Sequence, residues 1–242
     1  MAITMNNSVG NGRNRLLAAL SPADFSVLAP NLKDISLTQG DVLQEAGEAI
    51  KHVYFPQFGM ISLLAVMQNG SAVETATVGR EGAAGAMSGL GSRIAPHRSV
   101  AQIEGIASRI AAARFEAAVN GSTSIKDLIV RYSDCLMMMI QQSAGCNALH
   151  TLETRLCRWL LQTRDRNDSN RLPLTQEFLS QMLGVRRTTL TLIARNLQTL
   201  GLIRYRRGNI EILDRSGLEA KACECYAVIR RQSEQVFSQA NA

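Results

Sequence analysis

The sequence predicts an α+β fold: a β-rich N-terminal half, then one long helix, then a small helical domain that ends in a β hairpin. Three observations indicate this arrangement. Short β-prone runs alternate with glycine-bearing turns before residue 110, apolar residues keep a three-and-four spacing from about 122 to 149, and two short amphipathic patterns meet at Gly184. With 46% apolar residues in 242, the chain can form packed cores in more than one domain. We expect domains over residues 15–121, 122–150 and 151–242.

The N-terminal 14 residues are polar and rich in Asn and Gly, a composition typical of a disordered leader. A short helix is expected to begin near Arg15, and Ser21 followed by Pro22 predicts the start of a second one. The leader lacks the apolar core of a signal peptide, and no run approaches the roughly 18 apolar residues of a membrane-spanning helix. The sequence therefore predicts a cytoplasmic protein without a membrane partner.

Five β-prone runs predict a sandwich or barrel, because many short strands with turns at this spacing are typical of those folds. The expected strands are 34–37, 52–56, 60–66, 73–78 and 100–103. Asn69-Gly70 lies between the third and fourth of them and suits the two positive-φ positions of a type I′ hairpin turn.

A helix of roughly 26 residues is expected after Gly121 and Ser122, and at 1.5 Å per residue it is about 39 Å long. Its apolar stripe contains Ile125, Leu128, Ile129, Tyr132, Cys135, Leu136, Met139, Ile140, Gln142, Cys146 and Leu149. One face can pack on the helix's own domain while a stripe alongside suits a partner helix, so the length predicts a homodimer. The alternative is that the whole stripe, with the methionines at 137–139, is core.

Residues 172–213 carry the most specific pattern, after a helix expected over 151–164 and a polar loop over 165–171. Thr175 can cap a short helix that ends at Gly184, and a second helix follows and stops at Gly201. Its apolar side has Leu190, Ile193, Ala194, Leu197 and Leu200, and its other side has Arg187, Thr188, Thr191, Arg195 and Gln198. Two short helices joined at a glycine form a helix-turn-helix, whose second helix enters the major groove of DNA.

A basic hairpin follows, because β-prone runs at 202–205 and 210–213 flank the tip Arg-Arg-Gly-Asn, which can act as a wing on the DNA backbone. Residues 1–150 carry 11 basic and 11 acidic side chains, whereas residues 151–242 carry 15 basic and 9 acidic ones, and 14 of these 15 are arginine. Arginine binds phosphate or a guanine edge through two hydrogen bonds. The last third is therefore predicted to bind double-stranded DNA.

A resemblance to the bacterial Crp/Fnr family of transcription regulators rests on residues 174–189, which read LTQEFLSQMLGVRRTT, on Gly201-Leu202-Ile203 and on the basic hairpin. It covers nearly the whole chain. It implies an N-terminal jelly roll like a cyclic-nucleotide-binding domain, a dimerisation helix and a C-terminal winged helix-turn-helix. It also implies a regulator that binds a pseudo-palindromic DNA site as a homodimer, contacts RNA polymerase and is controlled by a signal at the jelly roll.

The resemblance places Arg187 on the residue that reads a guanine in each half-site, with Arg186 and Thr188 as its neighbours. Many members of the family have glutamate at the position of Thr188, so the base preference beside Arg187 is expected to differ. The other residues expected at the DNA are Gln176, Thr189, Thr191, Arg195, Arg206 and Arg207.

The jelly roll resembles a cyclic-nucleotide-binding domain more than it resembles a working nucleotide site. Nucleotide-binding members carry Gly-Glu-Leu and then Arg-Ser/Thr-Ala, whereas this chain has Gly-Ala-Ala-Gly at 82–85 and Arg-Ser-Val at 98–100. Ile-Gln at 140–141 replaces the Thr-Ser of cyclic-AMP binders. Because two of the three motifs that would bind a cyclic nucleotide are altered, the resemblance leaves the signal unidentified, with a cyclic nucleotide as one candidate. The residues expected around it are Gly82, Ala83, Arg98, Ser99 and Gln141.

Other chemistries find less support in the sequence. The five cysteines, at 135, 146, 157, 223 and 225, include no C-x-x-C pair, so neither a disulfide framework nor a metal site is expected. A redox switch at Cys135, Cys146 or Cys157 stays open. No catalytic constellation indicates an enzyme. The alternative function is a ligand-binding signalling module that acts through protein partners and has little DNA affinity.

Overall fold

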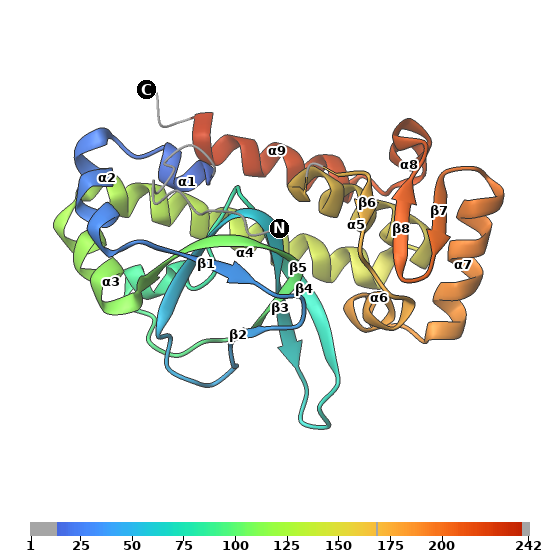
Figure 1. Ribbon diagram of the computed structural model, residues 1–242, viewed down its shortest axis with the longest axis horizontal. Coiled ribbons are helices and arrows are strands. Elements are labelled where there is room, and N and C mark those ends of the chain that lie inside the picture. The colour runs from blue at the N-terminus through green and yellow to red at the C-terminus, as the bar shows by residue number, and fades with distance from the viewer. Residues whose placement is uncertain (1–13, 168, 239–242) are drawn as a thin grey trace, which may run out of the picture.

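The computed structural model describes residues 14–167 and 169–238, and it confirms the α+β class and the predicted order of sheet, long helix and winged helix-turn-helix (Figure 1). The N-terminal half contains α1 (Arg15–Ala18), α2 (Pro22–Leu28), the 3-10 helix η1 (Ala29–Asn31), β1 (Lys33–Leu37), β2 (Val42–Gln44), β3 (His52–Val66), β4 (Ala72–Val78), the 3-10 helix η2 (Ala86–Leu90), β5 (Arg98–Ala111) and α3 (Ala112–Gly121). The long helix is α4 (Thr123–Leu149). The remainder contains α5 (Leu152–Asn167), β6 (Arg171–Leu172), α6 (Gln176–Leu183), α7 (Arg187–Thr199), β7 (Ile203–Arg206), β8 (Asn209–Ile212), α8 (Arg215–Lys221) and α9 (Cys225–Ser238).

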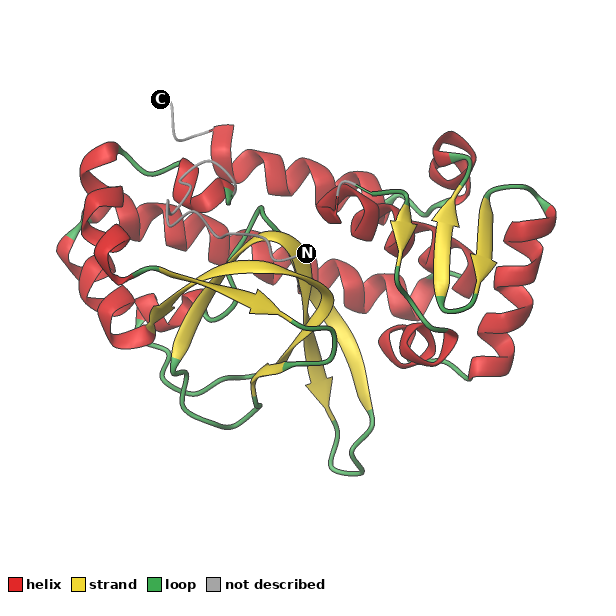
Figure 2. Cartoon of the chain, in the orientation of Figure 1, coloured by secondary structure: helices red, strands yellow, loops and turns green. Residues whose placement is uncertain are grey.

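The larger sheet is antiparallel, with strand order β1-β5-β3-β4 and β2 paired to β5 (Figure 2). The register of β3 against β5 shifts three times between Pro56 and Ile61, so the sheet bends there. Gly59 and Gly105 face each other at the bend. A Cβ on Gly59, whose φ is 84°, would lie 2.7 Å from the carbonyl oxygen of Glu104, so only glycine allows this approach.

The predicted strands lie inside longer ones. Runs 52–56 and 60–66 are one strand, β3, and the predicted 100–103 is part of β5. The predicted type I′ turn is wrong: five residues join β3 to β4, and of the Asn69-Gly70 pair only Gly70 has positive φ. The reason is local, since the Asn69 side chain accepts hydrogen bonds from the backbone N–H and the hydroxyl of Ser71.

Two further expectations need correction. Asn14 was expected in a disordered leader, but its buried side chain caps α1 and donates to the carbonyls of Pro56 and Gly82; residues 1–13 lie outside the described chain. The polar loop expected from 165 begins late, because α5 continues through Asn167. Asp165 stays helical and accepts hydrogen bonds from Arg215 and Tyr226. No helix in the described part of the chain is long and apolar enough to cross a membrane.

The stripe of α4 that the sequence singled out is mostly the face that packs inside the subunit. Nine positions, Ile125, Leu128, Ile129, Tyr132, Cys135, Leu136, Met139, Ser143 and Cys146, are buried. A second stripe at spacings of four and three is exposed: Val130, Asp134, Met137, Gln141, Ala144 and Ala148. The exposed stripe is the one a partner helix can reach.

The two halves share one core. Met60, Leu64 and Ile103 of the large sheet are buried against residues of the C-terminal half, among them Trp159 and Leu160 of α5. The last helix, α9, runs back along α4 to the N-terminal end (Figure 1), where Glu234 forms an ion pair with Arg15 at 2.6 Å. Movement of one half against the other must therefore open apolar contacts as well as bend the chain between the end of α4 and the start of α5.

Candidate nucleic-acid interface

Helix α6 begins at a side-chain cap and ends at a glycine, as the sequence predicts. The Thr175 hydroxyl accepts the backbone N–H of Phe178 at 3.2 Å, and Glu177 places negative charge in the first turn. Gly184 ends the helix with φ 65°, a conformation that L side chains rarely adopt. Leu179, Met182 and Leu183 are buried, so α6 supports the helix that follows.

Helix α7 presents the predicted arginine at its first turn. Leu190, Ala194 and Leu197 are buried and fix which way the helix faces. Five of the predicted DNA-contacting residues are exposed at the N-terminus of α7 and along it: Arg186, Arg187, Thr188, Thr189 and Arg195. Leu192 lies on the same side, is 65% exposed and was missed by the sequence reasoning. Its i+4 spacing from Thr188 was the available signal, and an apolar side chain there can contact a thymine methyl group.

Gln176 and Thr191 are half-buried, and they connect α7 to the neighbouring elements instead of facing the solvent. The Thr191 hydroxyl donates to the Gln176 side-chain oxygen at 2.8 Å, and the Gln176 backbone N–H donates to the Tyr205 hydroxyl at 3.1 Å. Gln198, expected on the DNA-facing side, accepts the backbone N–H of Tyr205 at 2.8 Å. These bonds tie α6, α7 and β7 into one unit.

The wing is a tight hairpin. β7 pairs with β8 up to Arg206 and Asn209, and the two turn residues, Arg207 and Gly208, have φ of 47° and 77°. Positive φ at both positions is the signature of a type I′ turn. Arg206 and Arg207 are both exposed at the tip. Residues 178–210 contain six arginines and no acidic residue, so α7 and the wing form one positively charged surface.

The residues expected to hold a sensor ligand do not gather around one cavity. Ala83 and Ser99 line a cavity of about 20 Å³, which is room for about one water molecule and far less than the several hundred Å³ of a ligand pocket. Arg98 forms an ion pair with Glu45 at 2.7 Å, and Gln141 lies on the exposed stripe of α4.

Tyr132 of α4 occupies the space beside the glycine-rich loop. Its hydroxyl donates to the carbonyl of Ala83 at 3.0 Å, and a Cβ on Gly82 would lie 2.6 Å from that hydroxyl. Burial raises the pKa of Tyr132, so it stays a neutral donor. The contact links the loop directly to the long helix.

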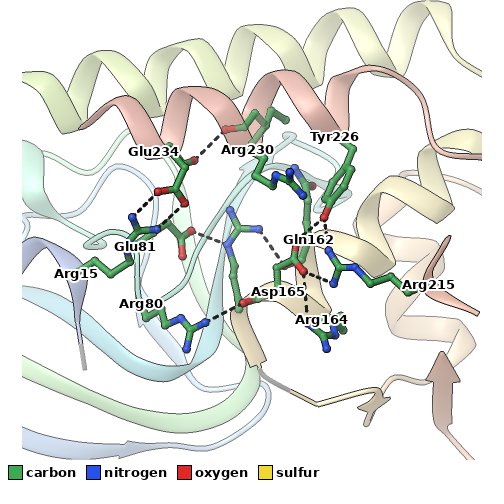
Figure 3. Close-up of a pocket in the computed structure, with 13 residues that line it drawn as sticks. Arg15, Arg80, Glu81, Gln162, Arg164, Asp165, Arg215, Tyr226, Arg230 and Glu234 are labelled. Atoms are coloured by element: carbon green, nitrogen blue, oxygen red, sulfur yellow. Dashed lines mark hydrogen bonds and ion pairs between the residues drawn. The ribbon is translucent and has the colours of Figure 1, made fainter. Parts of the chain in front are cut away.

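A larger, charged cavity lies where the two halves meet. It measures about 300 Å³ (Figure 3) and is lined by Arg15, Arg80, Glu81, Gln162, Arg164, Asp165, Arg166, Arg215, Tyr226, Ile229, Arg230, Ser233 and Glu234. Arg166 of α5 pairs with Glu81 of the N-terminal half at 2.6 Å, and Arg215 pairs with Asp165 at 2.6 Å. The Arg166–Glu81 pair joins the loop after β4 to α5, and the Arg215–Asp165 pair joins α5 to α8.

A second polar contact joins the halves through Glu74 of β4. Trp159 Nε1 donates to its carboxyl at 2.8 Å, and the Ser62 hydroxyl lies 2.6 Å from its other oxygen. Burial raises the pKa of Glu74 to about 7, against the opposing effect of these hydrogen bonds and of Arg158 and Arg166.

Two family models match the chain: the cyclic nucleotide-binding domain over residues 34–122 and the Crp-like helix-turn-helix domain over residues 154–221. They stand in the order of the two halves described above, on either side of α4. The chain belongs to the Crp/Fnr family. As a Crp/Fnr member it is a DNA-binding transcription regulator and not an enzyme. No curated protein gives a significant match over the chain.

Solved structures share the Crp/Fnr fold at low identity. FixK2 from Bradyrhizobium japonicum has a TM-score of 0.68 and 14% identity, over 79% of this chain and 98% of that one. A putative crp/fnr-family transcriptional regulator from Eubacterium rectale has a TM-score of 0.64 and 18% identity, over 85% and 96%. The c-di-GMP responsive global regulator CLP of Xanthomonas campestris has a TM-score of 0.63 and 14% identity, over 80% and 100%.

Removing the charge at the tip of this Crp/Fnr wing is expected to weaken DNA binding without changing its sequence preference. Asparagine tolerates positive φ, so Arg207→Asn keeps the type I′ turn and removes only the cation. The slope of log K against log salt should become shallower by about 0.9 for each phosphate that is no longer neutralised. Fluorescence anisotropy at several salt concentrations measures it. Arg93→Gln, which removes an exposed cation from the N-terminal half, should leave the slope unchanged.

Proposed function

We propose that the protein binds a pseudo-palindromic site in double-stranded DNA as a homodimer, with Arg187 reading a base in each half-site. The observation that supports it best is the exposed first turn of α7, which carries Arg187 within a stretch, residues 178–210, that contains no acidic residue. Arginine at this position can donate two hydrogen bonds to a guanine edge. Arg186, Thr188, Thr189 and Arg195 then contact the DNA beside it, Arg206 and Arg207 contact phosphates, and Gln176 and Thr191 position α7.

The dimer is proposed to form through the exposed stripe of α4. Spacings of four and three are those of a coiled-coil seam, and Val130 and Met137 are its largest apolar residues. A two-fold axis along this seam places two α7 helices on one side of the molecule. Half-sites one helical turn apart, about 34 Å, then suit them.

In this proposal residues 15–121 sense a signal, 122–150 dimerise and 151–242 bind DNA and, as the family resemblance implies, RNA polymerase in the cytoplasm. The small cavity at Ala83 and Ser99 gives no support to a cyclic nucleotide as the signal. Any signal acts only through its differential affinity for the two arrangements of the halves. Among the contacts between the halves, Arg166–Glu81 and Trp159–Glu74 are polar contacts that can transmit it.

The direct test is selection of binding sites from random DNA by the purified protein without added ligand. Enrichment of a two-fold symmetric site supports the proposal and shows that no added signal is needed. If nothing is enriched, the selection is repeated with cyclic AMP, cyclic GMP and c-di-GMP. Enrichment with one of them supports a ligand-controlled regulator, and failure in all arms overturns sequence-specific binding in favour of a module that acts through protein partners.

Introducing charge into the seam is expected to break the dimer. Met137→Glu places two carboxylates against each other across the two-fold axis, so the protein should elute as a monomer and bind the selected site at least about 100-fold more weakly, because a monomer reaches only one half-site. Light scattering after size exclusion gives the mass. The matched control is Met67→Glu, since Met67 is 50% exposed and Met137 is 53% exposed. If Met137→Glu stays dimeric, α4 is not the seam.

A further inference from the structure

Four side chains from distant parts of the chain converge just after the long helix. Cys146 lies in the last turn of α4, His150 follows that helix, Cys223 lies between α8 and α9, and Cys225 is the first residue of α9. Their ligand atoms all lie within 4.8 Å of one another. Cys146, Cys223 and Cys225 are buried, and none of the three is in a disulfide. We propose that these four residues bind a single zinc ion.

Two distances between ligand atoms lie close to those of a tetrahedral zinc site. Cys146 Sγ lies 3.5 Å from Cys223 Sγ, and Cys225 Sγ lies 3.5 Å from His150 Nδ1. Zinc bonds of about 2.3 Å to sulfur and 2.0–2.1 Å to nitrogen at the tetrahedral angle give separations of about 3.8 and 3.6 Å. A disulfide would need an S–S distance of about 2.05 Å. The arrangement therefore fits one shared ion better than a bond between two of the thiols.

The donor set selects the metal. Three thiolates and one imidazole in tetrahedral geometry are typical of structural zinc sites, and four protein ligands leave no open position for substrate. Iron–sulfur clusters of the common types take four cysteines, and this site has three.

The side chains around the four ligands support zinc binding through hydrogen bonds and charge. His150 Nε2 lies 3.2 Å from the Glu224 carboxylate, so the ring turns Nδ1 toward the sulfurs, as in carboxylate–histidine–zinc sites. Gln142 Nε2 donates to Cys225 Sγ at 3.0 Å. Zinc with three thiolates carries a net charge of −1, and the buried guanidiniums of Arg155 and Arg158 interact electrostatically with Cys146 and offset it.

The ion would hold the C-terminal end of α4 against the start of α9. Its ligands come from both sides of α5: the end of α4 before it, and the start of α9 after the helix-turn-helix. Binding therefore closes a loop that contains the whole DNA-facing unit, and it fixes the direction in which α9 runs back along α4. We expect removal of the metal by a chelator to loosen the contact between the end of α4 and the start of α9.

The test measures metal on the full-length protein, purified without a histidine tag and dialysed against metal-free buffer. Plasma mass spectrometry should find about one zinc per chain. In stripped protein, one equivalent of Co²⁺ should give the thiolate charge-transfer band and the intense d–d bands of tetrahedral cobalt. Cys223→Ser should retain less than about a tenth of the zinc, while Cys135→Ser, which changes a buried cysteine outside the cluster, should retain all of it.

Loss of zinc in Cys223→Ser could also result from misfolding, so a second variant changes an exposed residue that supports the site. Glu224→Gln changes a side chain that is 72% exposed and should weaken cobalt binding by about 10- to 100-fold, the range found for such supporting groups. Absence of zinc together with no tetrahedral cobalt spectrum overturns the proposal, as does equal metal loss in Cys135→Ser. Iron in place of zinc also overturns it. These readouts do not depend on DNA binding, so they stand apart from the proposed function.

Discussion

Arg187→Ala is expected to lower affinity for the selected DNA site by roughly 30-fold to 10⁴-fold. A bidentate arginine–guanine contact contributes about 1–3 kcal/mol, the dimer makes two of them, and each 1.4 kcal/mol is tenfold in affinity. The fold should be unaffected, because the Arg187 side chain is exposed and α7 is held by Leu190, Ala194 and Leu197. Fluorescence anisotropy with the selected site and with random DNA separates the loss of specificity from general weakening.

The control for Arg187 is Arg195→Ala. Arg195 lies two turns further along the same helix, is also exposed and carries the same charge. Its removal should weaken binding to selected and to random DNA by a similar factor, smaller than that for Arg187→Ala. The reason is that a phosphate contact does not depend on the base sequence. If Arg187→Ala and Arg195→Ala behave alike, Arg187 does not read a base.

Glu74→Gln is expected to stabilise the protein by about 2–3 kcal/mol above pH 7 and to change little below pH 4.5. In the unfolded chain this carboxyl ionises near 4.5, whereas burial raises its pKa in the folded protein to about 7. A raised folded-state pKa contributes stability that is complete below the unfolded value and is lost as the pH rises through 7. Each pKa unit corresponds to about 1.4 kcal/mol. Glutamine resembles the neutral form and avoids that loss.

The hydrogen bonds agree with a neutral Glu74. The Ser62 hydroxyl has one hydrogen but lies within hydrogen-bond distance of both the Glu74 carboxyl and the Gln102 side-chain oxygen. A protonated Glu74 can donate to Ser62 while Ser62 donates to Gln102, and the side-chain amide introduced by Glu74→Gln can donate in the same way. Urea unfolding from pH 4 to 8 measures the effect. Glu48→Gln, at an exposed carboxylate, should follow the wild type, and parallel curves for Glu74→Gln and wild type would falsify the assignment.

Features determined by a few neighbouring residues could be predicted from the sequence. The Thr175 cap, the Gly184 stop and the basic hairpin tip all lie where local rules place them. The same rules failed at Asn69, where a side chain hydrogen-bonded to Ser71 replaced the expected turn. The bend at Gly59 and Gly105 is a contact between strands distant in sequence, so no local pattern indicates it.

The candidate sites also differ in whether a local sequence pattern indicates them. Arg187 could be found because the helix-turn-helix pattern is short and continuous. The proposed zinc ligands could not, because Cys146 and Cys223 lie 77 residues apart and the sequence contains no C-x-x-C pair. The sequence left open which face of α4 packs inside the subunit and which face a partner covers, for a related reason. An apolar stripe alone does not say whether the sheet and α9 or a second subunit covers it.

The core shared by the two halves limits how this regulator can be engineered. Fusing residues 151–242 to another sensor would expose Trp159 and Leu160, and a sensor cut free after residue 150 would expose Met60, Leu64 and Ile103 to water. Both fragments are therefore expected to aggregate. A new DNA-sequence preference should instead be introduced by exchanging surface residues of α7. Those exchanges leave the apolar contacts between the halves in place.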